Sequence, residues 1–124
     1  MKIHFRRTAA AALVAGLSLL AACSTPPSLA YPEGATLKIT SKVWGYYQEY
    51  LGRQGGVRKD GAFLVALLGD VGVGARYSYC PSSADYCTGG SINRANKMCI
   101  EDHLKCVLFA RGPSIVVRYE IIDD

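Results

Sequence analysis

The chain has 124 residues, half of them hydrophobic, and a formal net charge of +4. Three of its fourteen basic residues precede residue 8 and no acidic residue precedes Glu33, so beyond residue 22 eleven basic residues stand against ten acidic ones, a net of +1. This length fits one domain, and so nearly neutral a body lacks the electrostatic footprint of a nucleic-acid-binding protein.

The first 22 residues have the layout of a secretory signal peptide. A basic head, residues 1–7, precedes an uncharged, largely apolar run over residues 8–22. That run is shorter than the roughly 20 residues that span a hydrocarbon core. A basic head followed by a short apolar stretch and small residues is typical of export signals, so we expect residues 1–22 to direct export.

The apolar run ends in Leu20-Ala21-Ala22-Cys23, which resembles the lipobox of bacterial lipoprotein precursors. The resemblance implies that signal peptidase II cuts between Ala22 and Cys23 and that Cys23 carries a diacylglyceryl thioether and acyl chains such as palmitate. A thiolate is a strong nucleophile, and several acyl chains would hold the protein firmly on a membrane. Ser24 is similar to the residue that follows the cysteine in outer-membrane members, whereas aspartate there often means inner-membrane retention. We expect a lipid anchor in the outer membrane, facing the periplasm.

A tether and a small domain are predicted to follow. Residues 23–34 hold three of the five prolines, a composition typical of an extended linker. The folded domain is then expected over residues 35–124, a size at which staples such as disulfides matter.

Periodicity predicts one helix and a strand hairpin in the first half of the domain. The helix begins at Ser41 as N-cap and runs to residue 53, with Trp44, Tyr47 and Leu51 on the inward face. Residues 61–69 form an apolar run typical of a strand buried on both faces. Residues 71–79 alternate between larger and smaller side chains, which predicts the second strand of the hairpin.

A second helix and a second hairpin are predicted in the other half. Ser91 is the expected N-cap of a helix to about His103, with Ile92, Ala95 and Cys99 inward. Strands at 105–110 and 114–121 flank Arg-Gly-Pro. The predicted fold is therefore α+β, a small two-layer domain with two helices on one face of a four-stranded, mostly antiparallel sheet, made of two hairpins and stapled by two disulfides.

Four cysteines remain beside Cys23, namely Cys80, Cys87, Cys99 and Cys106. An even number in an exported chain predicts disulfides, and four cysteines allow three pairings. The local pairs, Cys80–Cys87 and Cys99–Cys106, each enclose six residues. Both spacings are too wide for a structural zinc site, and no C-x-x-C-H haem motif occurs. We expect neither a metal nor a cofactor.

Short motifs along the body resemble a set of small exported alphaproteobacterial proteins of unknown function. The motifs are a tyrosine-rich first helix, Gly-Ala-Phe opening a strand, Tyr-Ser-Tyr-Cys, an alanine four residues before a cysteine, and a cysteine four residues before an alanine; they lie at residues 46–50, 61–63, 77–80, 95–99 and 106–110. The resemblance implies fold and location, with no activity to transfer. It also implies the Cys99–Cys106 pairing.

The candidate functional residues are aromatic. Trp44, Tyr46, Tyr47 and Tyr50 are more aromatic residues than one core face needs. We expect them to pack in the core and at its rim; if Tyr46 and Tyr50 face outward, the four form a possible binding patch. We therefore expect a binding or structural domain, not an enzyme, with an envelope protein or a cell-wall glycan as partner.

Two alternatives come from other functional classes. The first is a periplasmic hydrolase with His103 as base, oriented by Glu101 or Asp102; no nucleophile motif such as G-x-S-x-G supports it. The second is an inhibitor of a secreted enzyme that presents the loop at residues 80–87.

Overall fold

The computed structural model describes residues 25–53, 60–80 and 90–123 and divides the chain into two compact units, residues 1–30 and 31–124. The predicted signal peptide and Cys23 lie outside the described residues. In the first unit, Pro27–Leu29 forms a 3-10 turn (η1) inside the segment predicted to be an extended tether; proline suits the first position of such a turn. Over the described part of the chain, no helix is long and apolar enough to cross a membrane.

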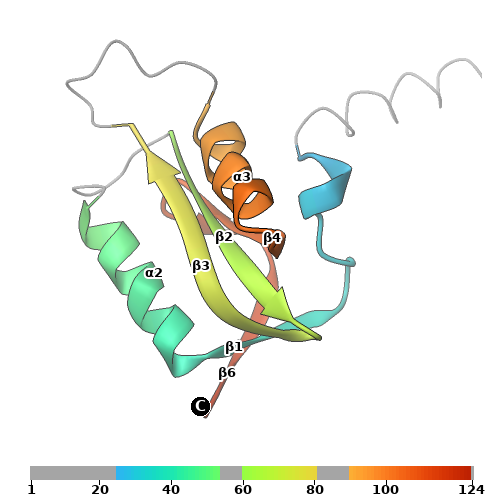
Figure 1. Ribbon diagram of the computed structural model, residues 1–124. Coiled ribbons are helices and arrows are strands. Elements are labelled where there is room, and N and C mark those ends of the chain that lie inside the picture. Colours follow the sequence, from blue (N-terminus) through green and yellow to red (C-terminus); the bar gives the residue numbers. More distant parts are fainter. Residues whose placement is uncertain (1–24, 54–59, 81–89, 124) are drawn as a thin grey trace, which may run out of the picture. The chain divides into compact units, whose positions relative to one another are not determined.

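The second unit contains one six-stranded mixed sheet and two helices (Figure 1). The strand order is β5-β4-β2-β3-β1-β6. Strand β1 lies parallel to both of its neighbours, β3 and β6, and the other pairs are antiparallel. In chain order the elements are β1 (Thr36–Thr40), α2 (Ser41–Arg53), β2 (Gly61–Leu68), β3 (Val71–Tyr79), α3 (Ser91–Glu101), β4 (Lys105–Arg111), β5 (Ser114–Ile115) and β6 (Arg118–Ile122).

The prediction of a four-stranded, mostly antiparallel sheet is wrong, and β1 is the first reason. This strand occupies a segment to which the sequence analysis gave no element. Leu37 and Ile39 are fully buried and alternate with the exposed Thr36 and Lys38, which is the period-two pattern of a strand. The strand is only five residues long, and it pairs with strands distant in sequence.

The second predicted hairpin is wrong beyond Ile115. Only β5 returns along β4; β6 pairs with β1 at the other end of the strand order. Just residues 116–117 connect β5 to β6, a stretch that reaches about 10 Å. The sheet must therefore twist strongly enough to bring its two ends together, and the rings of Phe109 (β4) and Tyr119 (β6) lie 5.3 Å apart.

The helices cover opposite faces of the sheet, so the expected two-layer arrangement is also wrong. Tyr47 and Tyr50 of α2 pack against Phe63 of β2. Cys99 of α3 is bonded to Cys106, and Cys106 pairs with Ala66, which lies on the opposite face of β2 from Phe63. Because both faces are covered, residues 61–66 are buried throughout, as the apolar run predicted.

Several local predictions are confirmed. Helix α2 and the β2–β3 hairpin occur where they were expected. The inward residues of α2 differ, however: Val43, Tyr47 and Tyr50 are buried, whereas Trp44 and Leu51 are half-buried. The N-cap also differs, because the Val43 N–H donates to the hydroxyl of Thr40 at 3.3 Å, the usual capping contact.

One of the two expected disulfides is found among the described residues. Cys99 and Cys106 are bonded, with their Cα atoms 6.4 Å apart, and they join the end of α3 to the start of β4. Cys87, the expected partner of Cys80, lies outside the described residues. The corrected fold class is a three-layer α+β domain with a six-stranded mixed sheet and the Cys99–Cys106 disulfide.

Candidate binding groove

Strand β3 has one edge that no described strand covers for most of its length. On one side it pairs with β2 from end to end. On the other side β1 reaches only Val71 and Gly72, because β1 ends at Thr40 and the chain turns at once into α2. Within the described residues, β3 is therefore unpaired on this side from Val73 to Tyr79.

The backbone groups at this edge can be assigned from two hydrogen bonds. The Cys80 N–H donates to Asp60 O on the β2 side, and residues of an antiparallel ladder point their backbone groups to alternate sides. Ala75 and Tyr77 precede Cys80 by an odd number of residues, so their N–H and C=O groups point away from β2. Consistently, the Ala75 carbonyl accepts a bond of 2.7 Å from the guanidinium of Arg76. The edge is a row of main-chain donors and acceptors.

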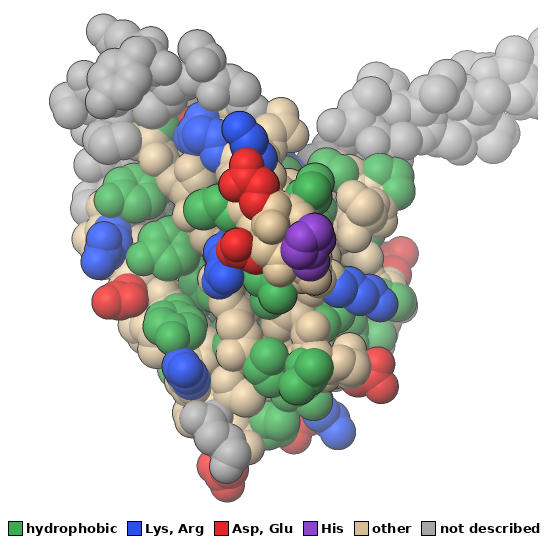
Figure 2. Space-filling view, viewed as in Figure 1, with side chains coloured by type: hydrophobic (Ala, Val, Ile, Leu, Met, Phe, Trp, Pro, Cys, Tyr) green, Lys and Arg blue, Asp and Glu red, His purple; other side chains and the backbone are tan. Residues whose placement is uncertain are grey.

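Helix α2 forms the opposite wall of a groove along this edge. The groove, with a volume of about 410 Å³, is lined by Lys42, Tyr46 and Glu49 of α2 and by residues 73–77 of β3. The three helix residues are spaced i, i+4, i+7 and so share one face. Hydrophobic side chains lie over α2 and its border with β3, interspersed with charged ones (Figure 2). We call this feature the α2–β3 groove.

The groove-lining face of α2 lies next to the buried face of the same helix. Val43, Tyr47 and Tyr50 are buried, each one residue beyond a groove-lining residue. Anchored in this way, α2 holds Tyr46 half-buried at the groove, while Lys42 and Glu49 are exposed. No ion pair of Lys42 or Glu49 occurs among the described residues; the Lys42 ammonium lies 5.9 Å from the centre of the Tyr46 ring.

No protein-family model, curated protein or solved structure matches this chain.

The structure separates the four aromatic residues of the predicted binding patch. Tyr47 and Tyr50 belong to the core, and their hydroxyls donate to Pro113 O at 3.2 Å and to Gly112 O at 2.6 Å. Burial raises the pKa of both phenols above the ordinary value. Trp44 stacks on Tyr119, at 5.4 Å between ring centres. Only Tyr46 lines the groove.

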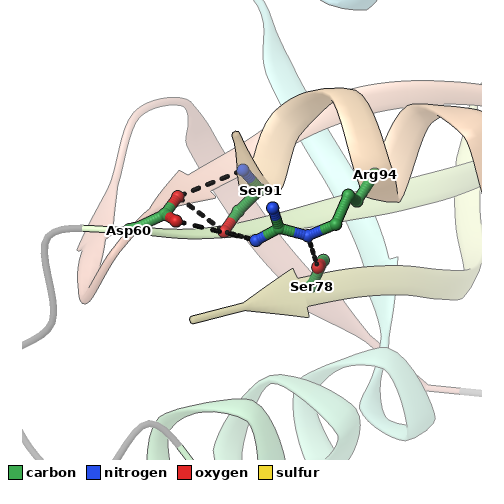
Figure 3. Close-up of polar contacts among 4 residues, drawn as sticks. All are labelled: Asp60, Ser78, Ser91 and Arg94. Atoms are coloured by element: carbon green, nitrogen blue, oxygen red, sulfur yellow. Dashed lines mark hydrogen bonds and ion pairs between the residues drawn. The ribbon is translucent and has the colours of Figure 1, made fainter. Parts of the chain in front are cut away.

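A polar cluster on the other face of the sheet ties α3 to β2 and β3 (Figure 3). Asp60 accepts bonds from the Ser91 hydroxyl at 2.7 Å and from the Ser91 N–H at 3.1 Å, so it caps α3 from 31 residues away. Arg94 bonds Ser78 at 2.9 Å and approaches the Asp60 carboxylate to 3.6 Å. Bonding from the Ser91 hydroxyl, more than the charge of Arg94, lowers the pKa of Asp60.

The described residues of this cluster hold the helix in place. The Ser91 side chain is buried, at 2% exposure, and its hydroxyl donates to a carboxylate and accepts from Arg94 at 2.9 Å. A serine nucleophile needs access to a substrate as well as a base, and the buried Ser91 lacks that access.

His103 has a structural task at the end of α3. Its φ of 55° is left-handed, and the N–H groups of His103 and Leu104 bond Ile100 O and Cys99 O at 3.1 and 2.9 Å, which is a Schellman ending. The neighbouring Asp102 carboxylate bonds Arg76 at 2.8 Å. The imidazole is exposed (Figure 2) and makes no hydrogen bond to the described residues.

Proposed function

We propose that this protein is a binding module of the bacterial cell envelope that takes up an extended peptide segment of a partner protein as an added strand along β3. The observation that supports this function is the unpaired edge at Ala75 and Tyr77 in the α2–β3 groove. Proteins that bind peptides by strand addition use such an edge for main-chain hydrogen bonds and an adjacent wall for side-chain selection.

The chemistry of the edge favours a peptide over a cell-wall glycan. Donor and acceptor pairs at Ala75 and Tyr77 recur every second residue, about 6.7 Å apart. An extended polypeptide presents N–H and C=O groups with this repeat, and a sugar chain does not. Arg76 already bonds the Ala75 carbonyl, but a carbonyl oxygen has two lone pairs and can accept a peptide N–H as well.

The proposal includes location. Cys23 is proposed as the lipid attachment site, with the domain held at the periplasmic side of the outer membrane. A Cys23→Ser precursor should remain uncleaved and unacylated, and intact mass would show the added 22 residues and the missing lipid. Normal processing of this variant would contradict the anchor while leaving the groove unaffected.

The binding function can be tested on detergent-solubilised full-length protein. A library of seven-residue peptides is screened by fluorescence anisotropy. The best peptide is then resynthesised in two registers, with either its odd-numbered or its even-numbered amides N-methylated. The expected result is loss of binding on methylation, because strand addition depends on main-chain donors. Equal binding of the methylated peptides in both registers would contradict strand addition.

A pair of proline substitutions gives a second, independent readout. Ala75→Pro removes an N–H that points into the groove and should abolish peptide binding while the domain stays folded, since proline is tolerated on open strand edges. Arg76→Pro removes an N–H directed at β2 and should instead destabilise the domain. If Ala75→Pro unfolds the protein, Tyr46→Ala, which changes only the other wall, still tests whether the groove is the site.

A further inference from the structure

We infer that the α2–β3 groove selects peptides by charge order: it takes an antiparallel strand that carries, at alternate positions, a basic residue, an apolar residue and then an acidic residue. This inference rests on the proposed strand addition and names the class of segment that is bound. It is carried by the order of Lys42, Tyr46 and Glu49 along the groove wall.

The direction of the wall relative to β3 is set by contacts at both ends. Helix α2 starts directly after β1, whose Ile39 pairs with Gly72, so Lys42 lies at the Val73 end of the groove. Near the other end of α2, Tyr50 packs on Tyr77 with ring centres 5.5 Å apart, which places Glu49 toward Tyr77. Helix and strand therefore run in the same direction, with positive charge first and negative charge last.

The spacing of the wall residues matches alternate residues of a strand. Lys42 and Glu49 are seven residues apart, about 10.5 Å along a helix axis. Strand positions i and i+4 are about 13 Å apart and face the same side, and flexible side chains close the difference. The i+2 residue then lies opposite Tyr46, whose half-buried ring favours an apolar partner.

The antiparallel direction follows from the backbone. Ala75 and Tyr77 each present both N–H and C=O to the groove, and in an antiparallel ladder one facing residue exchanges both bonds with them; parallel pairing is slightly less stable. The N-terminal end of an antiparallel peptide lies beside Glu49 and its C-terminal end beside Lys42. Its basic residue therefore precedes its acidic residue.

Other charges near the groove leave this polarity intact. Arg76, on the β3 wall, is paired with Asp102 at 2.8 Å. Arg53 lies further along the same face of α2 but does not line the groove. The α2 macrodipole, positive at the Lys42 end, acts in the same direction as the side chains.

The test compares two peptides of identical composition, Ser-Lys-Ser-Val-Ser-Glu-Ser and Ser-Glu-Ser-Val-Ser-Lys-Ser, both acetylated, amidated and labelled. At low ionic strength the first should bind about five to ten times more tightly, the size expected for two exposed ion pairs made or reversed. The preference should fade in 0.5 M salt, since salt screens exposed charges.

A charge-swapped protein is the matched control. Lys42→Glu/Glu49→Lys keeps the net charge, alters only exposed side chains and suits the helix dipole, so it should fold normally and prefer the second peptide. Equal affinities, or an unswapped preference in this variant, would overturn the charge-order inference while strand addition stands. If no peptide of either order binds, both the inference and the proposed function are refuted.

Discussion

The two faces of the sheet hold their helices by different means. Aromatic rings attach α2: Tyr47 and Tyr50 pack on Phe63, and Tyr47 also packs on Phe109. Small side chains, a disulfide and ion pairs attach α3, through Ala95, Cys99–Cys106 and the polar cluster at Asp60.

This difference explains where a ligand has room. On the α3 face, Arg76 and Ser78 of β3 are engaged by Asp102 and Arg94, so the helix is bonded across the strand. On the α2 face, the buried rings anchor the helix from one side only. Its neighbouring face, with Tyr46, is left to line a groove along the open strand edge.

The largest expected effect is loss of an aromatic ring on the α2 face. Phe109 is fully buried and contacts the rings of Tyr47, Phe63 and Tyr119. Phe109→Ala should lower the free energy of unfolding by about 4 kcal/mol, and Leu108→Ala, its neighbour on the α3 face, by about 3 kcal/mol. Urea denaturation measures both. A larger loss for Leu108→Ala would contradict the assignment of the main core to the α2 face.

Removal of the disulfide should weaken the α3 face selectively. Cys99→Ala/Cys106→Ala opens a link that encloses six residues and should destabilise the domain by about 2–3 kcal/mol. Amide exchange should accelerate in α3 well before α2, because local opening follows local restraint. Equal acceleration in both helices would show that the two faces open together.

Two glycines of β3 test how tightly each face of the sheet is packed. A Cβ atom on Gly72 would overlap Val65 and press on Ile39 on the α2 face, whereas one on Gly74 would meet only Ala66, at 3.7 Å. Gly72→Ala should therefore destabilise by about 1–3 kcal/mol and Gly74→Ala by less than about 0.5 kcal/mol. Thermal unfolding of the pair checks this, and similar losses would contradict the tight packing at Gly72.

A modest effect is expected at the polar cap of α3. Asp60→Asn keeps a capping oxygen but removes the charge that strengthens the bonds from Ser91, so it should lower the free energy of unfolding by about 1 kcal/mol at pH 7. Because the folded-state pKa of Asp60 is lowered, the carboxylate stabilises above its ordinary pKa of about 4, and this stabilisation is lost as the pH falls through the lowered pKa. The difference in free energy of unfolding between wild type and variant should disappear in acid. A difference that persists at pH 2 would show that the charge of Asp60 does not contribute to stability.

Sequence reasoning succeeded where structure is set by neighbours along the chain. Helix α2, the β2–β3 hairpin and the Cys99–Cys106 link join residues close in sequence. It failed for β1 and β6, whose pairing joins Leu37 to Tyr119, because nothing local encodes a partner so distant. The alternation at 36–40 was the one signal that would have found β1.

The groove was only half visible in the sequence for the same reason. Lys42, Tyr46 and Glu49 share a helix face by spacing alone, and Tyr46 was among the candidate binding residues. That this face borders an open strand edge depends on β1 ending at Thr40, which sequence reasoning did not predict.

The open edge of β3 is proposed to accept a peptide strand. The most direct measurement is residue-resolved amide exchange of β3 with and without saturating Ser-Lys-Ser-Val-Ser-Glu-Ser peptide. Exchange should slow at Ala75 and Tyr77, whose N–H groups face the groove, and change little at Gly74 and Arg76, which already face β2. Binding without slower exchange at Ala75 and Tyr77 would contradict the claim.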